Sequence, residues 1–165
     1  MFAIERIDPD AWELYRDLRL AALADAPHAF GSRLEVERER DETEWRGRLA
    51  ARTQFVVLDE GRPVGTVGCR PEGEHETELV SMWVARGSRG TGAADLLVSA
   101  VIEEARAQGA SSAILWVSEG NVPAEALYAR HGFVRTGRTQ PIDDDDPGRG
   151  SEFQMRRPSG ERRGG

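Results

Sequence analysis

Apolar residues near the start of the chain recur at helical spacing. Trp12, Tyr15 and Leu18 fall on one face of a helix. Asp8-Pro9 precedes them and supplies a cap followed by a proline in the first turn, which predicts a helix that runs to about residue 25. The same reasoning predicts further helices over residues 35–51, 91–108 and 121–130.

Shorter runs that alternate between apolar and polar residues, or that are apolar throughout, predict strands. Glu60-Gly61 separates two such runs and predicts a hairpin. The run at 113–117 is apolar throughout and is bounded by turn signals, which is typical of a buried strand. The predicted strands are 2–7, 54–58, 63–68, 76–84, 113–117, 133–138 and 152–156.

The order of these elements predicts a mixed α/β (α+β) fold with an antiparallel start. A chain of 165 residues is long enough for one domain with a full hydrophobic core. The sequence shows no internal repeat and no linker that would divide two domains. We therefore expect a single domain over residues 1–157 and a disordered tail over residues 158–165.

Composition narrows the range of partners. The formal net charge of −7 argues against nonspecific nucleic-acid binding, which needs a basic face, and is compatible with a cationic acceptor such as an amine. The single cysteine, Cys69, allows no internal disulfide and indicates a reducing compartment. No apolar run approaches the roughly 20 residues that span a membrane, and the first residues lack a signal-peptide pattern. We expect a cytoplasmic protein without a nucleic-acid or membrane partner.

Residues 86–94, Arg-Gly-Ser-Arg-Gly-Thr-Gly-Ala-Ala, are the most informative stretch. They join a predicted strand to a predicted helix, where small residues let backbone N–H groups approach a phosphate closely. A Walker A loop is excluded because it needs a lysine, and all 22 basic residues of this chain are arginine. A dinucleotide-binding loop would need a small residue where Asp95 stands. Residues 89–94 match a third pattern, Arg/Gln-x-x-Gly-x-Gly/Ala, and the remaining interpretation is an ordinary glycine-rich turn.

A second motif occupies Asn121–Phe133, which matches Asn-x-x-Ala-x-x-x-Tyr-x-x-x-Gly-Phe. With both motifs, the chain resembles the GNAT superfamily of acyl-CoA-dependent N-acetyltransferases over residues 2–157. Residues 18–23 and 29–32 resemble its bacterial type. The resemblance implies a central, mostly antiparallel sheet of about seven strands flanked by about four helices.

The resemblance also implies an activity. A neutral primary amine would attack the thioester of acetyl-CoA directly in a ternary complex, with acetyl-CoA as co-substrate and no metal. The acceptor would be a small-molecule amine or a protein amine, at an N-terminus or a lysine. An interpretation of another class is a non-catalytic module that binds or senses acyl-CoA. Several family members form dimers, so a homodimer is a further expectation.

The resemblance assigns acetyl-CoA binding to two segments. N–H groups of the strand before the loop would hold the pantetheine arm, and the loop amides would hold the pyrophosphate. Asn121 would cap its helix, touch the arm, or do both. The residues expected to bind acetyl-CoA are Met82, Trp83, Val84, Arg89, Gly90, Thr91, Gly92, Ala93, Ala94 and Asn121.

Tyr128 is the candidate general acid. A phenol with a pKa of about 10 suits proton donation to a thiolate whose thiol has a pKa of about 8.5. Periodicity alone favours a tyrosine that packs with Ala124 and Leu127 on a buried helix face. The motif match favours the catalytic interpretation.

Three carboxylates are candidates for the general base. Glu78 and Glu76 share one face of the strand before the loop, where a carboxylate would take the proton through water. Glu78 is the first choice, and Glu76 and Glu35 are alternatives. Ser118 is a candidate ligand contact or proton relay. His131 is a candidate titrating group, although a surface histidine before a C-terminal glycine explains it as well.

The acidic run at residues 143–146 has two interpretations. In the family this loop often borders the acceptor site, where it would attract a cationic amine. Otherwise it is a solvated loop. The side chains of Trp45 and Trp83 are assigned to core packing rather than to substrate stacking, and Cys69 is assigned to packing rather than to carrying an acyl group.

Overall fold

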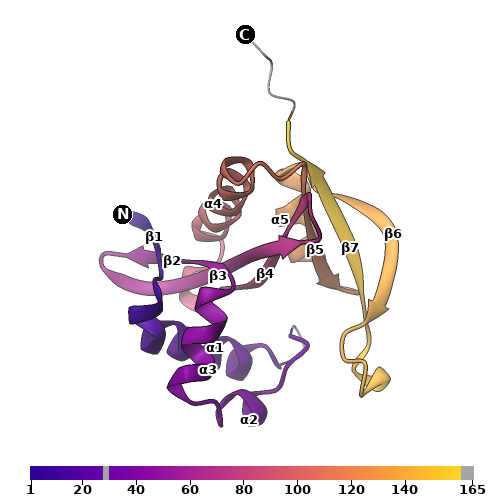
Figure 1. Cartoon of the computed structure of the whole chain (residues 1–165). Coiled ribbons are helices and arrows are strands. Elements are labelled where there is room, and N and C mark those ends of the chain that lie inside the picture. The colour runs from indigo at the N-terminus through magenta and orange to yellow at the C-terminus, as the bar shows by residue number, and fades with distance from the viewer. Residues whose placement is uncertain (28–29, 161–165) are drawn as a thin grey trace.

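In the computed structural model, which describes residues 1–27 and 30–160, a seven-stranded sheet forms the centre of the protein (Figure 1). The strands lie in the order β1-β2-β3-β4-β5-β7-β6. Every neighbouring pair is antiparallel except β4 and β5, which are parallel. This confirms the predicted mixed α/β class. The strands are β1 (Phe2–Arg6), β2 (Thr53–Asp59), β3 (Arg62–Glu72), β4 (Glu76–Val84), β5 (Ser112–Ser118), β6 (Val134–Pro141) and β7 (Ser151–Pro158).

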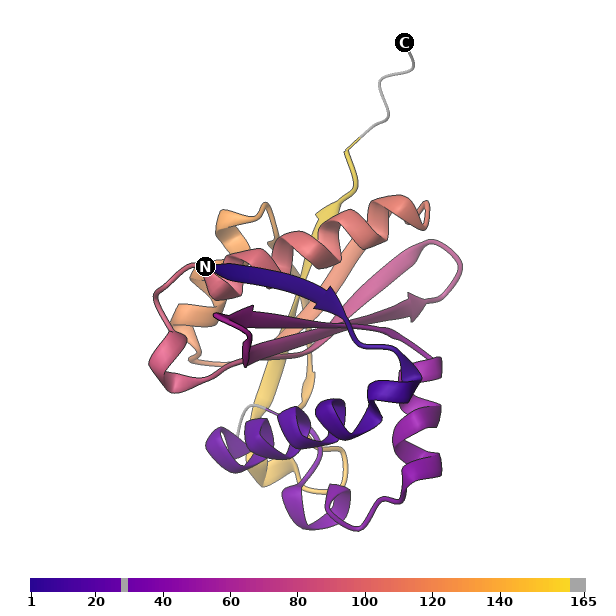
Figure 2. The same cartoon turned by 90° about the vertical axis from the view of Figure 1, so that its left-hand side faces the viewer.

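Helices cover both faces of the sheet (Figure 2). One face carries α1 (Trp12–Asp25), α2 (Leu34–Glu37) and α3 (Glu42–Ala50). The opposite face carries α4 (Ala93–Ala107) and α5 (Val122–Arg130). The sheet therefore separates two groups of helices, and a site that passes through the sheet can be reached by residues from both.

The central strands are buried on both sides because alternate side chains of a strand point to opposite faces. In β2, Val57 packs in the cluster under α4, whereas Val56 packs on the α1 side with Tyr15 and Trp45. The last two rings meet edge to face with their centres 5.6 Å apart. Burial raises the pKa of the Cys69 thiol to about 11, so this residue stays a packed thiol as expected.

The prediction of a single helix over residues 35–51 is wrong, because the structure has two helices there, α2 and α3. Asp41 Oδ1 accepts a hydrogen bond from the Glu44 N–H at 2.9 Å, and Glu44 Oε2 accepts one from the Asp41 N–H at 2.7 Å. This reciprocal capping box starts a new helix and gives the chain a place to turn.

The C-terminal boundary also differs from the prediction. Strand β7 includes Pro158, and the Ser159 N–H donates to the Ser111 carbonyl oxygen at 2.8 Å. Ordered chain therefore continues past the predicted start of the tail at residue 158. Residues 161–165 of that tail lie outside the described residues.

A buried ion cluster joins three helices on the α1 side. The fully buried carboxylate of Glu37 accepts hydrogen bonds from Arg19 Nε at 3.0 Å and from Arg19 Nη2 at 2.9 Å. Arg48 of α3 donates a further hydrogen bond at 2.6 Å. Burial opposes ionisation, but the hydrogen bonds and the arginine charge outweigh it and lower the pKa of Glu37 to about 2. The cluster thereby fixes the side chains of Arg19 and Arg48 on the α1 side of the sheet.

We expect Glu37→Gln to destabilise the protein by about 3 kcal/mol at neutral pH, because it leaves buried guanidinium groups without their carboxylate. Glu39→Gln, at an exposed position two residues on, should change the free energy of unfolding by less than about 0.5 kcal/mol. Urea unfolding of both variants measures the difference.

Since folding lowers the pKa of Glu37, the stabilisation that its carboxylate provides is fully present above pH 4.5 and is lost as the pH falls toward 2. Equal stability of the two variants at neutral pH would contradict this account.

Candidate active site

Strands β4 and β5 separate from each other within the sheet. They pair only where Glu76–Glu78 lies beside Ser112–Ile114, and the rest of β4, up to Val84, pairs with β3 alone. Strand β5 stays paired with β7 over Ser112–Ser118. A wedge-shaped gap therefore opens in the middle of the sheet, and its edges carry peptide groups that no β4–β5 ladder uses.

A bulge in β4 lies beside this gap. Between Val80 and Trp83 the strand has one residue more than β3 opposite, so Ser81 and Met82 together face Val67. Ser81 has a φ of 57°, in the left-handed region that is unfavourable for serine. Bulges of this kind bend a strand and often lie next to functional sites. This one falls where β4 leaves β5.

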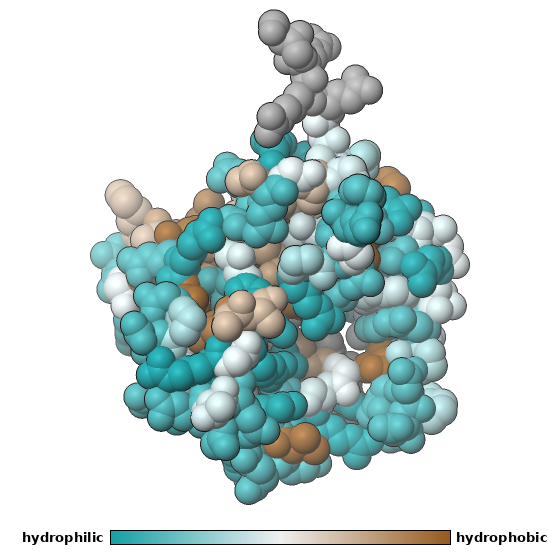
Figure 3. Space-filling model, viewed as in Figure 1, coloured by the Kyte–Doolittle hydropathy of each residue, from teal (hydrophilic) through white to brown (hydrophobic). Residues whose placement is uncertain are grey.

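A cavity of 530 Å³ lies in the gap, and its lining comes from both faces of the sheet. Figure 3 shows the surface hollowed between the α1–α3 helices and the β6–β7 hairpin. The size is within the range of sites for small molecules. The lining includes Arg19, Arg48, Arg52, Arg70, Glu78, Ser81, Met82, Trp116, Ser118, Asn121, Tyr128, Gln140 and Glu152.

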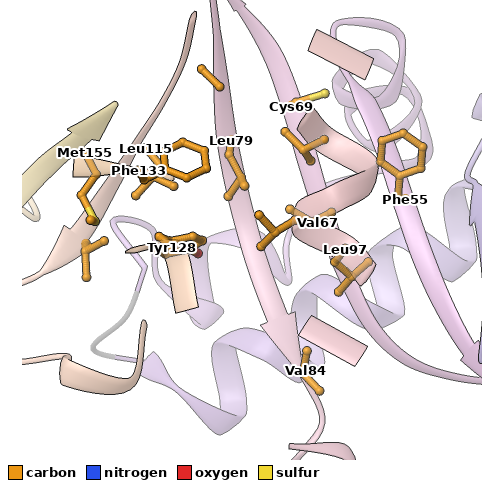
Figure 4. Packing of buried hydrophobic residues seen from close by; sticks show 14 of the residues in the cluster. Phe55, Val67, Cys69, Leu79, Val84, Leu97, Leu115, Tyr128, Phe133 and Met155 are labelled. Carbon is orange, nitrogen blue, oxygen red and sulfur yellow. The ribbon is translucent and has the colours of Figure 1, made fainter. Parts of the chain in front are cut away.

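Helix α5 contributes Tyr128 and the N-cap residue Asn121 to the cavity. Tyr128 packs edge to face on Phe133 with ring centres 6.0 Å apart, and Figure 4 shows it between the strands that carry Leu79 and Leu115. Burial raises the pKa of the phenol, so the group is protonated at neutral pH and is able to donate. The Asn121 side-chain oxygen accepts from the Ala124 N–H at 3.2 Å, which accounts for its cap role.

The loop before α4 presents a row of backbone N–H groups. Gly90 and Gly92 have φ angles of 75° and 93°, which glycine adopts without strain. Among the loop and cap hydrogen bonds of the described residues, no N–H from Gly90 to Ala94 donates to a backbone carbonyl. The first turn of a helix with its positive dipole end attracts anions. The backbone of Gly90, Thr91, Gly92, Ala93 and Ala94 is therefore arranged to hold a diphosphate.

The side chains of Arg89 and Trp83 are engaged within the protein. Arg89 pairs with Asp25 at the end of α1 and donates through Nε to the Val84 carbonyl oxygen at 3.0 Å. Trp83 Nε1 donates to Asp25 Oδ2 at 3.0 Å. The hydrogen bonds from Trp83 and Arg89 lower the pKa of Asp25 and tie the loop to α1. The Arg89 side chain thus ties the loop to α1 and β4, and the loop groups left to contact an anion are backbone N–H groups.

The β4 residues expected to hold the pantetheine arm differ in the direction of their peptide groups. The Ala85 N–H donates to the Val64 oxygen at 2.8 Å, which puts Trp83 in the next hydrogen-bonded position of the β3–β4 ladder. The Trp83 peptide group is therefore directed at β3, which differs from the expectation for this residue. By the same alternation the Val84 peptide group points away from β3, and Met82 lines the cavity.

Two carboxylates line the cavity. Glu78 accepts a hydrogen bond from Arg70 Nε at 3.1 Å. Glu152, which the sequence analysis missed, accepts one from Gln140 Nε2 at 2.7 Å. Burial and the nearby charge of Glu78 raise the pKa of Glu152, which strengthens this carboxylate as a proton acceptor. Glu152 and the buried Phe153 are neighbours on β7, so their side chains point to opposite faces of the sheet. This alternation was the available signal that Glu152 lies on the face opposite to Phe153.

The other acid–base candidates lie outside the cavity. Glu76 accepts a hydrogen bond from the Ser112 hydroxyl, which lowers the pKa of Glu76. Glu35 lies on α2 beside a separate hollow. His131 Nε2 lies 2.8 Å from Asp95 Oδ1 on α4. Glu78 and Glu152 line the cavity together with Tyr128, whereas Glu76, Glu35 and His131 do not.

The acidic run at residues 143–146 is largely paired within the protein. Arg33 contacts Asp143 at 3.5 Å and Asp146 at 3.0 Å, and Arg149 contacts Asp143 at 3.2 Å. These ion pairs compensate two of the four charges. The expectation that the run attracts a cationic acceptor gains no support from this arrangement.

Arginine dominates the cavity wall on the α1 side, and the sequence analysis missed this cluster. Arg48 lies in the last turn of α3 and Arg52 lies two residues after the helix ends, so their closeness in the sequence was the available signal. Arg19 and Arg70 come from α1 and β3, and only the packing of distant segments brings them to the same place.

Residues 1–27 and 30–160 contain no group of three or more His, Cys, Asp and Glu side chains placed to hold a metal ion. In the same part of the chain, no helix is both long enough and apolar enough to cross a membrane.

Comparison with known proteins gives a consistent result. The model of the acetyltransferase (GNAT) family matches residues 10–133. Rat N-acetyltransferase 8B is 36% identical over 93 residues, which cover 53% of this chain and 42% of that protein, so the chain spans less than half the length of this relative. A GNAT-family acetyltransferase from Streptococcus pneumoniae has a TM-score of 0.78 at 21% identity, with 97% of this chain and 100% of that chain covered. A ribosomal-protein-alanine N-acetyltransferase from Brucella melitensis has a TM-score of 0.70 at 25% identity, with 94% and 99% covered. By its family match, its sheet and its two motifs, the chain belongs to the acetyltransferase (GNAT) family.

Proposed function

We propose that the protein is an N-acetyltransferase that transfers the acetyl group of acetyl-CoA to a primary amine by direct attack in a ternary complex. The observation that carries this proposal is the position of Tyr128, a buried proton donor that lines the gap between β4 and β5. The N–H groups of Gly90–Ala94, in the loop that follows β4, support a co-substrate that carries a diphosphate. The N-acetyltransferase names of the relatives support the same activity.

In the proposed reaction the amine nitrogen attacks the thioester carbon, the C–S bond breaks, and an amide and a thiol are formed. Backbone groups of Met82 and Val84 at the gap position the thioester and polarise its carbonyl. Tyr128 donates its phenolic proton to the departing sulfur. The proton that the amine loses passes to a carboxylate of the cavity and balances the one that Tyr128 gives.

We propose that this carboxylate is Glu152, with Glu78 as its charged neighbour. Glu78 is fixed by a charge-assisted hydrogen bond from Arg70. Glu152 has a neutral partner, Gln140, and makes no ion pair within residues 1–27 and 30–160. Its raised pKa brings it closer to the working pH, where a general base is most effective.

A protein amine is the second candidate acceptor, since the Brucella melitensis relative is named for a ribosomal-protein alanine. The third candidate function is acyl-CoA binding without catalysis. Thiol release measured with small amines and with peptides that have a free N-terminus separates the three. Release with small amines supports the proposal, release with peptides alone supports the protein acceptor, and acetyl-CoA binding without any release supports the binding module.

We expect Tyr128→Phe to lower kcat by about 100-fold or more, because the leaving thiolate loses its proton donor. The affinity for CoA should stay unchanged, because the ring and its packing on Phe133 are retained. Thiol release and calorimetric titration with CoA measure the two effects. Tyr15→Phe is the matched control, since Tyr15 is the other tyrosine of the chain and packs on Trp45. A Tyr128→Phe enzyme with normal kcat would refute the role of this residue.

The pH dependence of kcat/KM tests the base. With Glu152 as base, activity should fall as the pH drops through the raised pKa of Glu152, since the carboxylate must be ionised to accept a proton. Glu152→Gln should lower kcat/KM at least about 10-fold and remove this acidic limb. Glu78→Gln should move the limb to lower pH, because the negative charge of Glu78 helps to raise the pKa of Glu152. An acidic limb that survives in Glu152→Gln and disappears in Glu78→Gln would assign the base to Glu78.

A further inference from the structure

The cavity contains a positive charge that the protein does not compensate. Four arginines line it. The carboxylate of Glu37 pairs with two of them, and that of Glu78 pairs with a third. Arg52 makes no ion pair with a carboxylate of residues 1–27 and 30–160. The four lining arginines are Arg19, Arg48, Arg52 and Arg70.

The guanidinium of Arg52 lies at the bulge where β4 leaves β5. Its Nη1 donates to Ser81 Oγ at 3.4 Å, and Arg19 Nη1 donates to the same oxygen at 3.1 Å. The Arg52 guanidinium also lies over the ring of Tyr15, with Cζ 6.0 Å from the ring centre. Two guanidinium groups therefore converge on one neutral hydroxyl, although like charges repel.

The surroundings of Arg52 penalise its charge. Burial, together with the neighbouring arginines, lowers the pKa of Arg52 from its ordinary value. Arg52 is half-buried, and a charge that is partly removed from water without a counterion is unfavourable unless it meets a partner. An arginine fork is also the group best suited to bind a carboxylate in a bidentate manner.

The negative side chains of the cavity lie on other elements. Glu78 belongs to β4 and Glu152 to β7, whereas Arg52 follows α3 and Arg19 belongs to α1. Arg70 of β3 already pairs with Glu78, so within the described residues the unpaired charges of the cavity are the guanidinium of Arg52 and the carboxylate of Glu152. A ligand with one cationic and one anionic group satisfies both.

We infer that the acceptor is a primary amine that also carries a carboxylate, bound with its carboxylate at Arg52 and Arg19 beside Ser81 and its amine toward Glu78 and Glu152. The inference rests on the proposed acetyl transfer and names the substrate class of that site. It replaces the purely cationic acceptor that the net charge of the chain suggested.

The test uses a panel of α- and ω-amino acids, each measured beside its carboxamide, with thiol release from acetyl-CoA as the readout. For the best acceptor, the acid should exceed its amide in kcat/KM by about 10- to 100-fold, as a hydrogen bond to a charged group allows. Arg52→Met should abolish this preference, mainly by raising KM for the acid. Arg62→Met, at an exposed position on β3, should retain it.

Thermal unfolding separates recognition from a structural role. Arg52→Met removes an uncompensated cation, so its Tm should equal or exceed that of the wild type, whereas a structural role predicts a lower Tm. Equal turnover of acid and amide, or a preference that survives Arg52→Met, would overturn the inference and leave acetyl transfer intact. If no amine in the panel causes thiol release from acetyl-CoA, both the proposed function and this inference are refuted.

Discussion

The separation of β4 from β5 is the constraint on which the site depends. The two strands pair over three positions only, and the bulge at Ser81 directs the rest of β4 along β3 alone. An interrupted ladder in the middle of a sheet is unfavourable unless other groups use the freed peptides. Here the interruption creates a passage between the two faces of the sheet. Helix α5 supplies Tyr128 from one face, and the α1 side supplies arginines from the other.

The charges around this passage divide between stability and recognition. Glu37 is fully buried and holds Arg19 and Arg48, so that cluster links α1, α2 and α3 and contributes to folding. Arg52 lies beside the same cluster without a carboxylate partner within the described residues, and burial beside other arginines disfavours its charge. In the inferred substrate complex, the carboxylate of the acceptor compensates this charge.

Much of the fold and part of the site could be predicted from local sequence. The glycine loop and the Asn121–Phe133 motif fix backbone geometry within one segment, and the loop and Tyr128 lie where those motifs indicated. The break between α2 and α3 at Asp41 was missed because the sequence around it is rich in charged residues. In such a stretch, an aspartate that caps a new helix cannot be told from one inside a continuous helix. The cavity arginines and Glu152 were missed because they come from segments far apart in the sequence, and only the folded packing of these segments brings them together. The direction of the Trp83 peptide group toward β3 was missed because strand register depends on the partner strand.

A crystal structure of the protein with acetyl-CoA tests the central claim most directly, since the account places the thioester in the gap between β4 and β5. The account predicts the diphosphate on the N–H groups of Gly90–Ala94 and the thioester sulfur within about 3 Å of the Tyr128 hydroxyl. A co-substrate bound elsewhere, or a sulfur remote from Tyr128 with the arm outside the gap, would contradict it.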